Sequence, residues 1–152
     1  MYTGVDMRTK ITNPTENPSV RLPKFLATVA AGFPSPADDY LDGKLDLTEL
    51  LITHPSATYI AEVSGDSMIE AGIHSGDLLI VNRAQEVFQD AIIIAVINGE
   101  LTCKIYDPRN KQLAPANKTM KPIPIPEDTD VICEGVVMHV IKRNITAHVC
   151  PG

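Results

Sequence analysis

The sequence predicts a mainly β domain that carries a long, flexible N-terminal arm. Short apolar, β-branched runs recur along the second half of the chain, and an Asn98-Gly99 pair, a strong hairpin-turn signal, separates two of them. The arm is indicated by residues 1–24, which are polar and contain three prolines. The expected strands are Thr58–Val63, Leu78–Val81, Ala91–Ile97, Leu101–Tyr106 and Val131–Ile141.

The segments between the arm and the first expected strand are short and irregular. A small-residue apolar stretch, Leu26–Ala31, ends at Gly32, and the following Phe33–Pro36 contains two prolines and cannot be the interior of a helix. A short helix is expected over Asp46–Ile52, because Asp46 can cap its start and a proline follows its end. Near the other end of the chain, prolines at alternate positions suit an extended segment but not a central strand: Pro122, Pro124 and Pro126.

Composition excludes several classes of protein. The 152 residues, 44% hydrophobic and 21% charged, suit a globular domain rather than a wholly disordered chain. No apolar run approaches the ~18–20 residues of a membrane span, and the N-terminus lacks the apolar region of a secretory signal. The three cysteines show no CxxC spacing, so we expect no disulfide framework, no metal site and a cytoplasmic location. No fingerprint of a bound cofactor is present either.

The charge is distributed unevenly along the chain. The net charge is −6, but residues 1–31 hold four basic and two acidic side chains, so the rest of the chain is strongly acidic. An acidic body argues against a protein that grips nucleic acid by neutralising phosphates. We therefore expect no direct sequence-specific DNA binding.

The sharpest local motif is Ser64-Gly65-Asp66-Ser67-Met68, at the end of an expected strand. A serine in such a turn can expose its hydroxyl beside converging backbone N–H groups, which is what acyl transfer requires of a nucleophile and an oxyanion hole. Most Gly-Asp-Ser turns, however, only cap or reverse the backbone. A nucleophilic Ser67 would also need a base.

Two residues are serious candidates for that base. His74 lies seven residues further on and could form a Ser-His arrangement with a neighbouring aspartate. Lys104 lies in the strand after the Asn98-Gly99 turn, on the same strand face as Thr102. A lysine base must be neutral, which burial without a counter-ion can achieve by lowering its pKa. Periodicity alone does not choose between the two.

Short motifs follow one another in a specific order and spacing: Gly32–Ala37, Leu50–Ile52, His54–Tyr59, Ser64–Ile69, Gly76–Val81, Gly99–Lys104 and Gly135–Ile141. Together they resemble the UmuD-like members of the LexA-like self-cleaving serine peptidases (peptidase family S24). The likeness covers roughly residues 25–143.

The resemblance implies a LexA/signal-peptidase-like β domain over residues 32–152 and an arm, residues 1–31, that self-cleavage removes. Ser67 becomes the nucleophile and Lys104 the general base, with the backbone N–H groups of Asp66 and Ser67 as the oxyanion hole. The scissile bond becomes Ala31–Gly32. A small residue before the bond and a glycine after it suit a narrow cleft, although UmuD-like proteins often have cysteine at the position of Ala31.

The resemblance also implies partners. UmuD-like proteins form homodimers, are cleaved under stimulation by a RecA filament on single-stranded DNA, and then serve a UmuC-type Y-family polymerase in error-prone translesion synthesis. This implies an accessory role in SOS mutagenesis, and other replication proteins are further candidate partners.

Three alternative functions compete with this interpretation. A LexA- or phage-type repressor needs a DNA-binding domain before the cleavage site, and thirty-one residues with three prolines cannot supply a helix-turn-helix. A signal-peptidase-like enzyme acting on other proteins would normally need a membrane anchor. A binding module with a vestigial Ser-Lys pair would not cleave itself at all.

Overall fold

The computed structural model describes residues 19–25, 29, 31–32, 41–128 and 131–144. The Phe33–Pro36 segment, most of the Leu26–Ala31 stretch, residues 1–18 and the C-terminal tail lie outside the described residues. Contacts divide the chain after Leu50 into two compact units, which are considered separately below.

The first unit contains a pair of antiparallel strands. Strand β1 (Arg21–Phe25) pairs with β2 (Leu41–Asp46), with Arg21 opposite Asp46 and Phe25 opposite Leu41. A register shift falls between Pro23 and Phe25, as expected for a proline, which cannot donate a ladder hydrogen bond. The sequence predicts an extended arm here but not its partner. Residues 26–40, which include Ala31 and Gly32, connect the two strands.

A short helix follows β2, as the sequence predicts. Helix α1 spans Leu47–Leu51. The Asp46 carboxylate accepts hydrogen bonds from the backbone N–H groups of Thr48 at 2.8 Å and Glu49 at 3.4 Å, so it is the expected cap.

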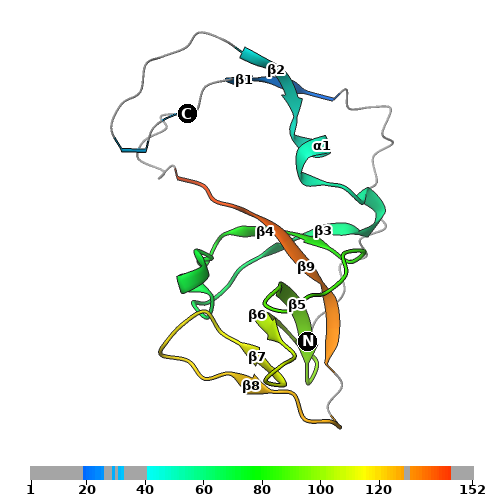
Figure 1. Cartoon of the computed structure of the whole chain (residues 1–152), viewed down its shortest axis with the longest axis vertical. Coiled ribbons are helices and arrows are strands. Elements are labelled where there is room, and N and C mark those ends of the chain that lie inside the picture. The colour runs from blue at the N-terminus through cyan, green and yellow to red at the C-terminus, as the bar shows by residue number, and fades with distance from the viewer. Residues whose placement is uncertain (1–18, 26–28, 30, 33–40, 129–130, 145–152) are drawn as a thin grey trace. The chain divides into compact units, whose positions relative to one another are not determined.

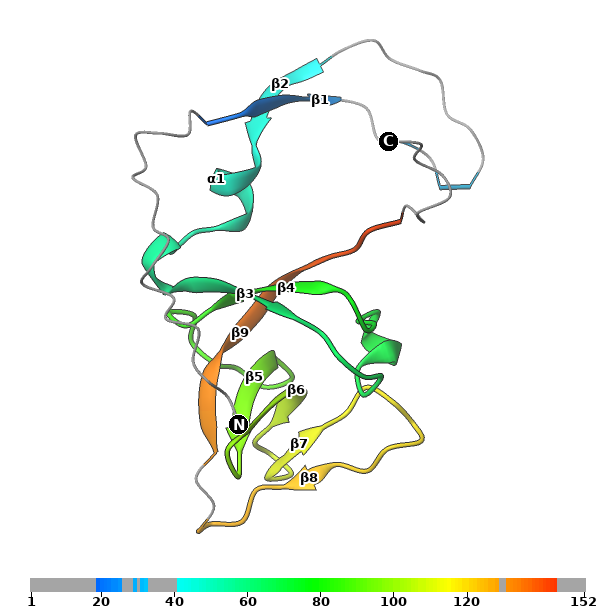
Figure 2. The same ribbon diagram turned by 180° about the vertical axis from the view of Figure 1, so that it is seen from behind.

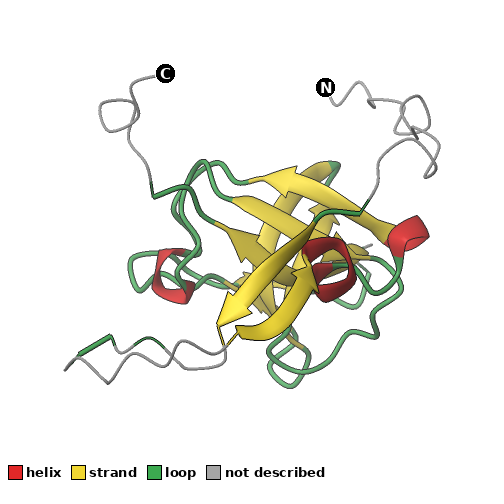
Figure 3. Cartoon of the chain, turned by 90° about the horizontal axis from the view of Figure 1, so that it is seen from above, coloured by secondary structure: helices red, strands yellow, loops and turns green. Residues whose placement is uncertain are grey.

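The second unit is built on one antiparallel sheet, whose strands and connecting turns are shown in Figures 1 and 3. Its strand order is β3-β4-β9-β5-β6-β7-β8. All five strands predicted from the sequence are present, with ends shifted by at most one residue, whereas β7 was not predicted. The proline-containing β8 lies at the sheet edge, as its alternating prolines predict. The elements of this unit are the 3-10 turns η1 (Pro55–Ala57) and η2 (Ile69–Ala71) and the strands β3 (Thr58–Glu62), β4 (Leu78–Asn82), β5 (Ile92–Ile97), β6 (Glu100–Asp107), β7 (Gln112–Ala114), β8 (Ile123–Pro124) and β9 (Ile132–Ile141).

The β5–β6 hairpin sets the register of Lys104. Asn98 and Gly99 both have positive φ, 50° and 81°, as a two-residue hairpin turn of this hand requires. Ile97 therefore pairs with Glu100, and Ile93 stands opposite Lys104. The turn predicted from the sequence is confirmed, and it fixes which face of β6 carries the lysine.

Strand β9 is long and joins the two halves of the sheet. It pairs with β4 along one part and with β5 along another, and both ladders contain a register shift. Figure 2 shows the strand continuing from beside β4 to beside β5. Gly135 lies in this region with φ +134°, and a Cβ atom there would come within 2.8 Å of Val81 Cγ1 and 3.1 Å of the Asn82 carbonyl oxygen. The sequence-predicted long or bent strand is therefore present, and it bends where a side chain would not fit.

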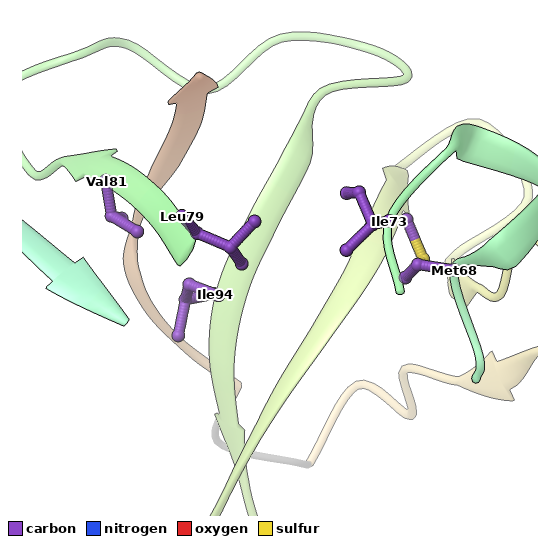
Figure 4. Close-up of a cluster of buried hydrophobic side chains, with 5 residues drawn as sticks. All are labelled: Met68, Ile73, Leu79, Val81 and Ile94. Carbon is purple, nitrogen blue, oxygen red and sulfur yellow. The ribbon is translucent and has the colours of Figure 1, made fainter. Parts of the chain in front are cut away.

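Two apolar clusters fill the interior of the second unit. The cluster in Figure 4 combines residues from β4 and β5 with two from the segment after β3: Met68, Ile73, Leu79, Val81 and Ile94. The other consists of Ala91, Ile93, Ala95, Leu113 and Val136. Successive residues of β5 therefore enter different clusters, as expected for a strand buried on both faces. Met68, only 1% exposed, anchors the turn that carries Ser67.

We predict that Gly135→Ala lowers the free energy of unfolding by about 2–4 kcal/mol, through backbone strain and overpacking together. Urea unfolding of the purified chain measures the change. Gly76→Ala is the matched control, because Gly76 also has positive φ (+91°) but open space around its Cβ position. Equal losses in the two variants would show that the contact with β4 contributes nothing.

Candidate functional site

Ser67 lies in a tight turn after β3, and packing and backbone hydrogen bonds hold this turn in place. Gly65 adopts φ +96°, a conformation that favours glycine, two residues before the serine. On the other side, the carbonyl oxygen of the buried Met68 accepts hydrogen bonds from the N–H groups of Ala71 at 3.1 Å and Ile73 at 3.2 Å. Ser67 itself is half-buried between these two anchors.

The structure brings Lys104 to Ser67. The Lys104 Nζ atom donates hydrogen bonds to Ser67 Oγ at 2.9 Å, to Thr102 Oγ1 at 2.8 Å and to the Cys103 carbonyl oxygen at 3.1 Å. The side chain extends from β6, and the residue is only 8% exposed. All three acceptors are neutral oxygens, so none of these contacts supplies a counter-ion for an ammonium group.

Burial changes the acid–base behaviour of this lysine. Loss of hydration disfavours the charged form and lowers the pKa of Lys104 below its ordinary 10.5. A Cys103 thiolate would act in the opposite direction, but burial raises the pKa of Cys103 to about 11, so this thiol stays neutral near neutral pH. The site therefore favours a neutral amine in contact with a hydroxyl.

A neighbouring loop holds the Ser67 turn from the other side. Asn117, in the connection between β7 and β8, donates from Nδ2 to the carbonyl oxygen of Asp66 at 2.9 Å. The N–H of Glu70 donates to the Ala116 carbonyl at 2.8 Å, and the N–H of Lys118 donates to Glu70 Oε2 at 2.9 Å. Three hydrogen bonds thus join residues 116–118 to residues 66–70.

His74, the alternative base, belongs to a different cluster. Its Nδ1 atom is 3.0 Å from Lys142 Nζ, and its backbone N–H donates to Asp77 Oδ2 at 2.8 Å. Lys142 also forms an ion pair with Asp77. The hydrogen bond from Lys142, followed by the one from the His74 backbone, lowers the pKa of Asp77. His74 thus ties the β3–β4 connection to the end of β9.

Ala31 and Gly32 belong to the first unit, whereas Ser67 and Lys104 belong to the second. Both residues of the expected scissile bond are exposed. Val29, two residues before Ala31, is 88% exposed. Exposed backbone of this kind is accessible to a peptidase.

The contacts of two residues at the site were not predicted from the sequence. The period of two places Thr102 on the same strand face as Lys104, but it does not predict the hydrogen bond between their side chains. Asn117 carries no such signal, since 50 residues separate it from Ser67 and only the fold joins them. Within the described ranges, no group of three or more His, Cys, Asp or Glu side chains gathers to hold a metal ion. The helices of these same ranges are all too short or too polar to cross a membrane.

Comparisons with known proteins agree with the architecture. The Peptidase S24-like family matches residues 24–138. The chain is 40% identical over 138 residues to protein ImpA of Salmonella typhimurium, covering 86% of this chain and 90% of ImpA. It is 41% identical over 121 residues to protein MucA of Escherichia coli, covering 78% of this chain and 82% of MucA. The LexA repressor of Stenotrophomonas maltophilia is 35% identical over 127 residues, which is 82% of this chain but 59% of that repressor.

We predict that the Lys104 amine titrates below 10.5 in the folded chain and near its ordinary value in urea, as measured by NMR of its ε-carbon. The folded pKa lies below the unfolded one, so between the two the unfolded chain binds more protons. Stability should therefore rise with pH through that window, and Lys104→Met should remove this dependence.

Ser67→Ala serves as the control for the titration. Burial is the first cause of the lowered pKa, so this variant should keep most of the shift. A folded Lys104 that titrates at or above its value in urea would contradict the assignment of a neutral amine.

Proposed function

Because the chain belongs to the Peptidase S24-like family, we propose that it is a self-cleaving serine peptidase. In this proposal Ser67 attacks the Ala31–Gly32 peptide bond and Lys104 is the general base. The observation that carries the proposal is the 2.9 Å contact between Lys104 Nζ and Ser67 Oγ, at an amine that is 8% exposed. The family relationship supports the class of reaction, and this contact supports the choice of Ser67 and Lys104.

The same contact serves proton transfer once the amine is neutral. A neutral amine has two N–H groups, which can donate to Thr102 Oγ1 and the Cys103 carbonyl, and its lone pair then faces Ser67 Oγ. The neutral Lys104 amine accepts the Ser67 hydroxyl proton while Oγ bonds to the Ala31 carbonyl carbon. The resulting lysine ammonium then protonates the Gly32 amine as the Ala31–Gly32 bond breaks. Water, deprotonated by the same lysine, releases Ala31 from the serine ester and regenerates the hydroxyl. No third residue is required, since Thr102 Oγ1 and the Cys103 carbonyl already orient the amine.

The developing oxyanion needs hydrogen-bond donors near Ser67. The backbone N–H groups of Asp66 and Ser67 are the candidates, because the Ser67 turn presents this stretch of backbone beside the nucleophile. Such donors act most strongly where water is excluded. The half-buried serine and the buried lysine meet that condition.

Self-cleavage suits a segment of the same chain or of a partner copy. A tethered segment has a high effective concentration without needing binding affinity of its own. Regulation can then act on whether the segment reaches Ser67 and Lys104. We propose that a RecA filament on single-stranded DNA promotes this step, and that the protein acts as a homodimer.

Cleavage at Ala31–Gly32 would also affect the pairing of strands β1 and β2. Strand β1 lies before the bond and β2 after it, so the cut converts an intramolecular strand pair into two separate chains. A two-stranded pair is only marginally stable even when connected. Loss of β1 would leave the edge of β2 unpaired and open to another strand. We propose that the product uses its altered surface to bind a UmuC-type Y-family polymerase in SOS mutagenesis.

We predict that Ser67→Ala and Lys104→Met each slow self-cleavage by at least about 1000-fold, because both members of the pair are needed for nucleophilic attack. Intact mass spectrometry measures the full-length chain and a product beginning at Gly32 during mild alkaline incubation.

His74→Ala is the matched control, since His74 contacts Asp77 and Lys142 instead of the serine. This variant should cleave within a few-fold of the wild-type rate. If His74→Ala fails to cleave while Lys104→Met cleaves at the wild-type rate, the base is the histidine and not the lysine.

We predict that the cleaved body captures a Y-family polymerase from DNA-damaged cells several-fold better than full-length Ser67→Ala protein does. Quantitative mass spectrometry of both captures makes the comparison. Equal capture would remove the proposed switch. Tight, specific binding of the body to a duplex operator would instead support a repressor, the class to which the LexA relative belongs by name.

A further inference from the structure

We infer that Asn117 is a positioning residue for the oxyanion hole. It holds the peptide unit between Asp66 and Ser67 so that the Ser67 N–H points to where the oxyanion forms. The inference rests on the proposed self-cleavage and adds a residue that the nucleophile and the base do not account for.

The orientation of the Asn117 side chain is fixed by its own contacts. Its Oδ1 atom accepts hydrogen bonds from the Thr119 backbone N–H at 3.0 Å and from Thr119 Oγ1 at 2.8 Å. The NH₂ group is therefore the end that faces Asp66, and it donates to the Asp66 carbonyl oxygen at 2.9 Å. Asn117 is only 8% exposed, so water competes weakly for these hydrogen bonds.

The planarity of the peptide bond transmits this contact to the serine. In a trans peptide the carbonyl C=O and the following N–H point in opposite directions. With the Asp66 carbonyl directed at Asn117, the Ser67 N–H is directed away from it. Within the described part of the chain, this N–H donates no hydrogen bond. It is therefore available for a ligand.

Little else in the turn fixes the plane of this peptide. Gly65 next to Asp66 has wide conformational freedom. The other donor to the Asp66 carbonyl is the Ile69 N–H at 3.4 Å, a long hydrogen bond. Loss of the Asn117 amide would therefore let the peptide rotate and turn the Ser67 N–H away from the reacting carbonyl.

The loop that carries Asn117 is itself anchored to the turn. Ala116 packs against the cluster that contains Met68, and its carbonyl accepts the Glu70 N–H. Lys118 donates its backbone N–H to the Glu70 carboxylate. The backbone that carries Asn117 is therefore held in place, as the backbone of a positioning residue must be.

The test compares first-order self-cleavage of the full chain between pH 7 and 10 for wild type, Asn117→Ala and Asn117→Asp. We expect the rate at high pH to fall about 10- to 100-fold in Asn117→Ala, less than the loss of a direct oxyanion donor. Asn117→Asp should lose at least as much, because its carboxylate repels the Asp66 carbonyl. In Asn117→Ala the apparent pKa of the rate profile should stay at the wild-type value, because this substitution adds no charge and leaves Lys104 unchanged.

Two further variants keep the test decisive. Lys118→Ala should cleave at the wild-type rate, because only its backbone contacts Glu70. Thr119→Ala removes one of the two donors that orient the Asn117 amide at an exposed position, and it should slow cleavage about five-fold with the fold intact. If the Asn117 variants do not fold, the cleavage rate of Thr119→Ala tests the inference instead.

The outcomes separate this inference from the proposed function. A wild-type rate in Asn117→Ala or, where that variant is unfolded, in Thr119→Ala overturns the positioning role while self-cleavage stands. In Asn117→Ala, a shifted apparent pKa with an unchanged rate at high pH also overturns it, because the asparagine would then act through the lysine. A wild-type chain that does not cleave removes the proposed function, and this inference with it.

Discussion

The structure of the candidate site depends on one constraint, the removal of the Lys104 amine from water while it touches Ser67. Burial without a carboxylate partner favours the neutral amine, which is the form that can accept a proton. Two parts of the chain must meet to achieve this, β6 with its lysine and the turn after β3 with its serine. The Asn98-Gly99 turn sets the register of one, and the buried Met68 anchors the other.

Strand β6 contains two buried ionisable side chains, Lys104 and Asp107, whose surroundings affect their charged forms in opposite ways. Lys104 has only neutral acceptors and no counter-ion, so burial disfavours its ammonium form and lowers its pKa. Asp107, three residues further along β6, is equally buried but accepts hydrogen bonds from the side chains of Asn110, Gln89 and Gln112. These contacts lower the pKa of Asp107 to about 2 and keep it ionised. Hydrogen bonding therefore stabilises the end of β6, whereas desolvation at Lys104 costs stability and favours reactivity.

Strand pairing performs different tasks in the two units. In the second unit β9 pairs with both β4 and β5 and so joins the two parts of the sheet, although it carries no candidate site residue. In the first unit β1 and β2 lie on either side of the expected scissile bond. A cut between paired strands removes their covalent connection, which supplies much of the stability of so small a pair. Cleavage at this bond would therefore weaken the hydrogen bonds between β1 and β2 as well as shorten the chain.

The sequence by itself determined the mainly β architecture, because a period of two, the Asn98-Gly99 turn and the proline positions are local signals. It also singled out Ser67 as the candidate nucleophile, but it left Lys104 and His74 as two candidates for the base. Strand periodicity shows on which face a side chain lies, but not how far that side chain is from Ser67. The β1–β2 pair, β7 and the contact of Asn117 with the Ser67 turn were decided by tertiary structure. Each depends on contacts between residues far apart in the chain, and the free energy of such contacts has no signature in the local pattern of residues.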